Sequence, residues 1–129
     1  MPEDALKHVS AYFVTIDFTN RNLGAMFRKD GAPWCLYKSS DNFTAISDFI
    51  DVSQIKDPQN VRLALTVGDE KRQDFNTSAM IHRIADQIAY LSKHMTLNEG
   101  DMILTGTGEG VAPVKVGDII QTELFENDE

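Results

Sequence analysis

The clearest pattern along the chain is an alternation of apolar and polar residues between positions 61 and 67. Apolar side chains occupy every second position from Val61 to Val67, which is the period of a half-buried β-strand. Gly68-Asp69 follows directly and predicts a turn into a partner strand from Lys71 to Phe75. The two strands are therefore expected to form a hairpin.

Two other segments have the signatures of helices. One predicted helix covers residues 82 to 95, because apolar residues recur there at helical spacing, at Ile84, Ile88, Leu91 and Met95. The other is shorter and runs toward Lys29. Thr19 or Asn20 can cap its start, and Asp30-Gly31-Ala32-Pro33 ends it.

Short apolar runs bounded by turn residues predict three more strands. They are Tyr12 to Phe18, which we expect to be buried, Met102 to Thr105, and Ile119 to Phe125. Asp57-Pro58 and residues 98 to 101 are predicted turns between elements. The elements together predict an α+β, β-rich fold with a few short helices.

Composition limits the size and the partners of this fold. A chain of 129 residues with 42% hydrophobic residues suits one domain or part of one, and nothing in residues 1–129 marks a domain boundary. The 20 acidic residues outnumber the 12 lysines and arginines. Nucleic acid and anionic membranes are therefore disfavoured as partners. No apolar run approaches the roughly 20 residues of a membrane span.

The thiol and imidazole groups give little indication of chemistry. Cys35 is the single cysteine, which favours a reducing compartment, and we expect it to be a small buried hydrophobe rather than a nucleophile. His82 and His94 are expected to be structural, and no group of residues has zinc-site spacing. The first residues show no targeting signal.

A glycine-rich loop follows the predicted Met102–Thr105 strand. Residues 106 to 110 have the spacing G-x-G-x-G, but they lead toward another strand and not into a helix. A dinucleotide site needs the helix N-terminus, so nucleotide binding is disfavoured. The backbone N–H groups and hydroxyl of such a turn could instead hold a small carboxylate.

Asp17 lies near the end of the predicted Tyr12–Phe18 strand. A carboxylate in this position is costly to bury unless it meets a cation. Arg21 is one turn further on, and spacing alone favours an ion pair with it over a metal ligand.

Several motifs, taken in order, resemble the fumarylacetoacetate hydrolase family. They are Asp17-Phe18-Thr19-Asn20-Arg21-Asn22, Gly31-Ala32-Pro33-Trp34, Lys38-Ser39-Ser40-Asp41, Arg72-Gln73-Asp74, Asn76-Thr77-Ser78-Ala79-Met80-Ile81 and Gly100-Asp101-Met102-Ile103-Leu104-Thr105-Gly106-Thr107. They cover nearly the whole chain and resemble most the branch of acylpyruvate hydrolases and oxaloacetate decarboxylases.

The resemblance implies a fold and an activity. The fold is a mixed β-sheet roll that forms a homodimer and binds Mg²⁺ or Mn²⁺. The activity is cleavage of a carbon–carbon bond in a 2,4-dioxo acid, or decarboxylation of oxaloacetate, so the partner is a small 2-oxo acid. A mitochondrial or cytoplasmic location is also implied.

The same resemblance assigns roles to individual residues. Asp17 matches the metal-binding aspartate of the family. Lys38 and Arg21 match catalytic positions. Thr107, with Gly106 and Lys38, matches the residues that hold the substrate carboxylate.

The chain departs from the family pattern in its carboxylates. It contains no Glu-x-Glu pair for the metal and no His-x-x-Glu pair, since Ala11 stands three residues after His8. One carboxylate is a poor basis for Mg²⁺, so weak metal binding is expected. Phe75 stands where glycine is common in the family, and Gly108 where proline is common.

These departures leave three hypotheses. Residues 1–129 form a partial catalytic domain, incomplete on its N-terminal side, that is weak or inactive alone. Alternatively, the chain is a catalytically silent remnant that dimerises or binds a small carboxylate, or it is an isomerase of the same fold. Missing strands would leave sheet edges unpaired, which favours association.

Overall fold

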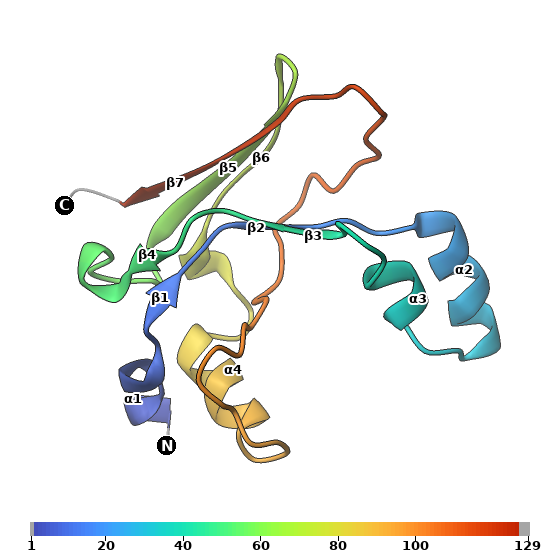
Figure 1. The fold of residues 1–129 in the computed structure, drawn as a ribbon. Helices are drawn as coiled ribbons and strands as arrows, with labels where there is room; N and C mark the ends of the chain where they lie inside the picture. The colour runs from blue at the N-terminus through green and yellow to red at the C-terminus, as the bar shows by residue number, and fades with distance from the viewer. Residues whose placement is uncertain (1, 127–129) are drawn as a thin grey trace. The chain divides into compact units, whose positions relative to one another are not determined.

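The computed structural model describes residues 2–126, which form two compact units. One unit contains the described residues up to Tyr12 and those from Ile50 onward, and the other contains Phe13–Phe49. Figure 1 shows the elements of both units in chain order. Every strand pair in the described part of the chain is antiparallel, and the predicted β-rich α+β class is confirmed.

The larger unit is built around a three-stranded sheet of order β6-β5-β7. Its central strand β5 (Val61–Val67) pairs with β6 (Glu70–Asn76) on one side and with β7 (Ile120–Glu126) on the other. Figure 1 shows the long β7 running beside β5. The buried side chains of β5 are Val61, Ala64 and Val67.

The predicted hairpin is confirmed, with one irregularity. Gly68 adopts a left-handed φ of 57°, a conformation that costs glycine nothing, and thereby closes the turn between β5 and β6. The register shifts between Leu65 and Thr66, whose partners are Gln73 and Lys71, so Arg72 has no partner on β5. The extra residue of this β-bulge lies on β6, and burial along β5 does not follow the simple alternation of the sequence, since Ala64 is buried as well as Val61 and Val67.

Short helices accompany this sheet. They are α1 (Pro2–Ala5), α4 (Ile84–Leu91) and the 3₁₀ turns η1 (Leu6–His8), η2 (Val52–Gln54) and η3 (Thr77–Ala79). The predicted helix over 82–95 exists but is shorter. It packs against α1, and none of its residues is fully buried. Near these helices, β1 (Ala11–Tyr12) pairs with β4 (Ile50–Asp51).

The smaller unit joins a two-stranded sheet to two helices. Strand β2 (Thr15–Asp17) pairs with β3 (Thr44–Ile46), and the helices are α2 (Arg21–Asp30) and α3 (Cys35–Lys38). The predicted helix after Asn20 is thus confirmed. The rings of Phe27 and Tyr37 meet edge to face, with centroids 6.2 Å apart, and tie α2 to α3.

Two expectations about strands are wrong. The run from Tyr12 to Phe18 is divided into β1 and β2 and is not buried, because Val14 between them bonds to the side chain and backbone of Ser47. Residues 102–105 form no strand, although the Gln87 side chain binds the Thr105 carbonyl. The predicted last strand is confirmed as β7, one residue later than expected.

Cys35 also differs from expectation. It begins α3 and is exposed to solvent, so the predicted buried role is wrong. Tyr37, two residues on, is the buried member of this helix, with 6% of its surface exposed. In so short a helix only one face can turn toward α2, and Tyr37 occupies it.

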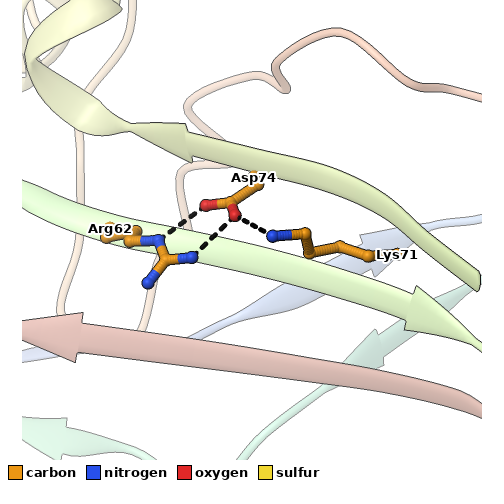
Figure 2. A network of polar contacts seen from close by, with 3 residues as sticks. All are labelled: Arg62, Lys71 and Asp74. Carbon is orange, nitrogen blue, oxygen red and sulfur yellow. Dashed lines mark hydrogen bonds and ion pairs between the residues drawn. The ribbon is translucent and has the colours of Figure 1, made fainter.

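An ionic network crosses the hairpin on its surface. Asp74 on β6 accepts two hydrogen bonds of 2.6 Å from the Arg62 guanidinium and one of 2.5 Å from the Lys71 ammonium, as Figure 2 shows. The hydrogen bond from Arg62, followed by that from Lys71, lowers the pKa of the Asp74 carboxyl from its ordinary value. The Arg62 guanidinium also lies 5.3 Å from the centre of the Phe125 ring on β7.

We predict that this network makes stability depend on pH. Because the folded-state pKa of Asp74 is depressed, its contribution is fully present above the ordinary aspartate pKa of about 4 and is lost as pH falls through the folded value. Asp74→Asn should therefore lower the urea midpoint at pH 7 and have a shrinking effect below about pH 4. Asp69→Asn, in the nearby turn, is the control. An effect of Asp74→Asn that is independent of pH contradicts the prediction.

Candidate functional site

A polar cluster forms in the smaller unit where β2 ends. The Lys38 ammonium pairs with Asp17 Oδ2 and donates a hydrogen bond of 2.9 Å to Thr19 Oγ1. Lys38 closes α3, and the Asn20 N–H bonds to the Tyr37 carbonyl at 3.1 Å, which holds the end of α3 beside the chain that leaves β2. The ammonium is therefore fixed between a carboxylate and a hydroxyl.

The cation that meets Asp17 is not the expected one. Sequence spacing favoured Arg21, but in the described part of the chain Arg21 forms no ion pair, and Lys38 takes this place. The pairing joins residues 21 positions apart. Local spacing could not indicate it, because it depends on how α3 packs beside the end of β2.

Arg21 instead lines a pocket together with Lys38. The pocket has a volume of about 420 Å³ and is bounded by α2, α3 and the loops at their ends, through Thr19, Arg21, Gly24, Arg28, Gly31, Ala32, Trp34, Tyr37 and Lys38. Its lining includes three cationic side chains and no carboxylate. Such a lining favours an anionic ligand.

The other two predicted site residues, Gly106 and Thr107, lie in the larger unit. Gly106 has a left-handed φ of 111°, and Thr107 is exposed. Gln73 on β6 donates from Nε2 to Thr107 Oγ1 at 2.9 Å. Sequence reasoning missed Gln73. It lies within the Arg72-Gln73-Asp74 motif, but only the tertiary fold brings it to the loop.

The described residues do not make up a complete divalent-metal site. Among residues 2–126, no three His, Cys, Asp or Glu side chains gather closely enough to hold a metal ion. Asp17 could supply one oxygen ligand, and its carboxylate is paired with Lys38. A hard cation such as Mg²⁺ needs further oxygen ligands.

Comparison with known proteins identifies the class to which this fold and these residues belong. The sequence matches the family described as "Fumarylacetoacetate (FAA) hydrolase C-terminal" over residues 1–127. The chain belongs to the fumarylacetoacetate hydrolase family, as its motifs predicted.

Relatives at the sequence level include two mitochondrial proteins. The oxaloacetate tautomerase FAHD1 of Arabidopsis thaliana is 44% identical over 118 residues, which are 91% of this chain and 53% of the relative. The oxaloacetate decarboxylase of Dictyostelium discoideum is 40% identical over 119 residues, which are 92% of this chain and 55% of the relative. The chain thus spans about half the length of the curated relatives it matches.

Solved structures share the fold. The fumarylpyruvate hydrolase of Pseudomonas aeruginosa, in complex with Mn²⁺ and pyruvate, is 33% identical with a TM-score of 0.92, covering 96% of this chain and 53% of that one. The yeast family member ynq8 is 32% identical with a TM-score of 0.93, covering 98% and 54%. Separately, no helix in the described residues has the length and apolarity to cross a bilayer.

We predict that the Asn20 cap stabilises the cluster around Lys38. The Asn20 side chain accepts a hydrogen bond of 3.1 Å from the Leu23 N–H at the start of α2. Removing such a cap costs about 1 kcal/mol. Asn20→Ala should therefore lower the free energy of unfolding in urea by about that amount, and Asn20→Asp should retain most of it.

The control is Asn22→Ala, on the exposed first turn of the same helix. Alanine is the better helix former there, so this variant should be neutral or slightly stabilising. Equal losses from Asn20→Ala and Asn22→Ala would show that the cap is not the source of the effect.

Proposed function

We propose that this chain is the catalytic part of an enzyme that acts on small 2-oxo acids, with oxaloacetate and acylpyruvates as the substrate class. The observation that carries the proposal is the Lys38 ammonium, which is fixed by Asp17 and Thr19 at the edge of a pocket lined by cations. The printed names of the relatives, oxaloacetate tautomerase, oxaloacetate decarboxylase and fumarylpyruvate hydrolase, support the same substrate class.

These three reactions share one type of intermediate, the enolate of a 2-oxo acid. Tautomerisation of oxaloacetate moves a proton from the carbon beside the keto group to the keto oxygen. Decarboxylation breaks a bond at that same carbon, releases CO₂ and leaves the electron pair in the enolate of pyruvate. Hydrolysis of an acylpyruvate adds hydroxide to the distant carbonyl and again expels a pyruvate enolate. Stabilising negative charge on one oxygen therefore serves all three.

In this proposal Lys38 stabilises the enolate oxygen or gives it a proton. An ammonium that is already oriented stabilises a developing negative charge most strongly in a site sheltered from water. Nothing around it then has to reorganise when the negative charge forms on the substrate. Arg21, in the same pocket, contributes to binding of the anionic substrate. Gly106 and Thr107 hold the substrate carboxylate through the backbone and the hydroxyl of the loop.

A longer protein that contains this chain would use a divalent metal ion, and this chain would supply only part of the metal site. The Pseudomonas relative holds Mn²⁺ together with pyruvate, and Asp17 here would contribute one ligand to Mg²⁺ or Mn²⁺. The described residues do not supply the rest. We therefore propose that this polypeptide binds divalent metal weakly and turns over slowly by itself.

Assembly and location follow as further parts of the proposal. Large apolar side chains such as Phe49, Ile81 and Val116 are more than half exposed, and association as a homodimer would cover surface of this kind. The Arabidopsis and Dictyostelium relatives carry the word mitochondrial in their names, which supports a mitochondrial over a cytoplasmic location.

A second candidate function is a non-catalytic module that dimerises or binds a small carboxylate. The lack of a three-ligand metal group among residues 2–126 favours it. The cationic pocket would serve such a module as well as an enzyme, so only turnover distinguishes the two.

We predict weak metal binding by the 129-residue polypeptide. Calorimetric titration with Mg²⁺ should give an affinity in the millimolar range or weaker, because Mg²⁺ dehydrates reluctantly and meets few carboxylates here. Micromolar affinity, together with oxaloacetate decarboxylation that Asp17→Ala abolishes, would overturn this prediction.

We predict a kinetic role for Lys38 in a chimera that joins this chain to the part of the Arabidopsis relative that it does not match. Lys38→Ala should lower kcat about a hundred-fold with little change in KM, because the ammonium acts on charge that develops in the transition state. Lys29→Ala, on the exposed face of α2, is the control. A folded chimera with metal bound and no turnover would favour the non-catalytic module.

A further inference from the structure

One side chain of β6 binds three successive residues of the glycine-rich loop. Gln73 Nε2 lies 2.9 Å from Thr107 Oγ1, 3.2 Å from the Gly108 carbonyl oxygen and 2.9 Å from the Glu109 carbonyl oxygen. The loop has no regular secondary structure of its own. Its local conformation therefore depends on bonds of this kind to the sheet.

The geometry fixes which end of the Gln73 amide faces the loop. Carbonyl oxygens accept hydrogen bonds and cannot donate them, so the two carbonyls require the NH₂ group on this side. The NH₂ group has two protons for three acceptors, so at least one proton is shared, and Thr107 Oγ1 can face this nitrogen only as an acceptor because the amide nitrogen accepts no hydrogen bond. The hydroxyl proton of Thr107 is thereby left for another partner.

That proton has no protein acceptor in the described part of the chain, and Thr107 is exposed. A hydroxyl that accepts from an amide and has a free proton is a donor toward the solvent side. Such a proton can be donated to an anionic oxygen, such as that of a carboxylate. Gln73 therefore directs the Thr107 proton away from itself and toward the exposed side of the loop.

Two other residues of β6, Phe75 and Arg72, hold the loop against the same strand. The Phe75 ring lies so close to Gly108 that a Cβ built there would be 2.5 Å from the ring. Gln73 and Phe75 are two residues apart, so they share one face of β6. Arg72, the bulged residue, donates to the Pro113 carbonyl at 2.7 Å, and its own carbonyl leaves no room for a side chain at Gly110.

Phe75 and Gly108 thus form a matched pair. Phe75 occupies the space that any side chain at position 108 would need, since even a methyl group there would overlap the ring. The two departures from the family pattern at these positions are consistent with each other. The close packing leaves Thr107, one residue earlier, on a loop that cannot easily move away from Gln73.

We infer that Gln73 is a positioning residue, which orients the Thr107 hydroxyl as a hydrogen-bond donor for the carboxylate of a 2-oxo acid. This inference rests on the proposed function for the nature of the ligand. The orientation of the hydroxyl is independent of the proposed function, because it follows from the acceptors around Gln73.

The test replaces the amide with an acid of the same shape. Gln73→Glu puts an acceptor where Nε2 was, so the Thr107 hydroxyl should turn its proton toward the new carboxylate, and the two loop carbonyls should be repelled. Pyruvate is the probe, followed by ¹⁵N NMR titration of the 129-residue chain. We expect its affinity to fall about ten-fold or more.

Two further variants separate orientation from a general structural effect. Gln121→Glu adds the same charge at an exposed position of β7 and should leave pyruvate affinity within about two-fold. Thr107→Val removes the hydroxyl, and in that background Gln73→Glu should cause little further loss, because the two residues act through one proton. Additive losses from the two changes would overturn the inference.

Backbone order of residues 107–109 provides a readout that needs no ligand. Gln73→Glu should lower their ¹⁵N order parameters, because the loop loses its bonds to β6, whereas Gln121→Glu should not. If the unaltered chain fails to bind pyruvate, the proposed function fails, and the order parameters still decide the positioning role. Unchanged order parameters, or unchanged pyruvate affinity in Gln73→Glu, would overturn it.

Discussion

The pairing of β6 with β5 is the interaction on which the larger unit depends most. The hairpin turns through Gly68, and the bulge leaves Arg72 without a partner on β5. Gln73 and Phe75, beyond the bulge, share the face that meets the glycine-rich loop. A one-residue change in register would move both side chains to the other face of the sheet. The loop would then lose its hydrogen bonds and its packing together.

The group around Lys38 and the glycine-rich loop both present hydrogen-bond donors, although they use different chemical groups. In the smaller unit, the Lys38 ammonium lies between a carboxylate and a hydroxyl, and the neighbouring pocket has three cationic side chains. In the larger unit, the loop offers a hydroxyl whose proton has no acceptor among residues 2–126. The chain as a whole is acidic, with a formal charge of −8. Each cluster nevertheless offers groups that suit an anion.

The family of this chain is established, whereas the described residues do not form a complete metal centre. The family is established by a match that spans residues 1–127 and by solved structures with the same fold. A divalent-metal centre needs several oxygen ligands, and the described residues gather no such group. The chain spans about half the length of the curated relatives it matches, and among the described residues Lys38, Arg21 and Thr107 are the candidate site residues that do not depend on a metal.

The sequence by itself determined the features that depend on neighbouring residues. The β5–β6 hairpin, the capped helix α2 and the existence of α4 follow from apolar period, turn glycines and caps, and the motif order determined the family. Contacts between distant segments were decided only by the tertiary structure. Lys38 takes the place predicted for Arg21 beside Asp17, Cys35 is exposed, and residues 102–105 form no strand. Gln73 reaches Thr107 across 34 positions. Local propensity carries no information about such pairs, because their free energy arises only when packing brings the two segments together.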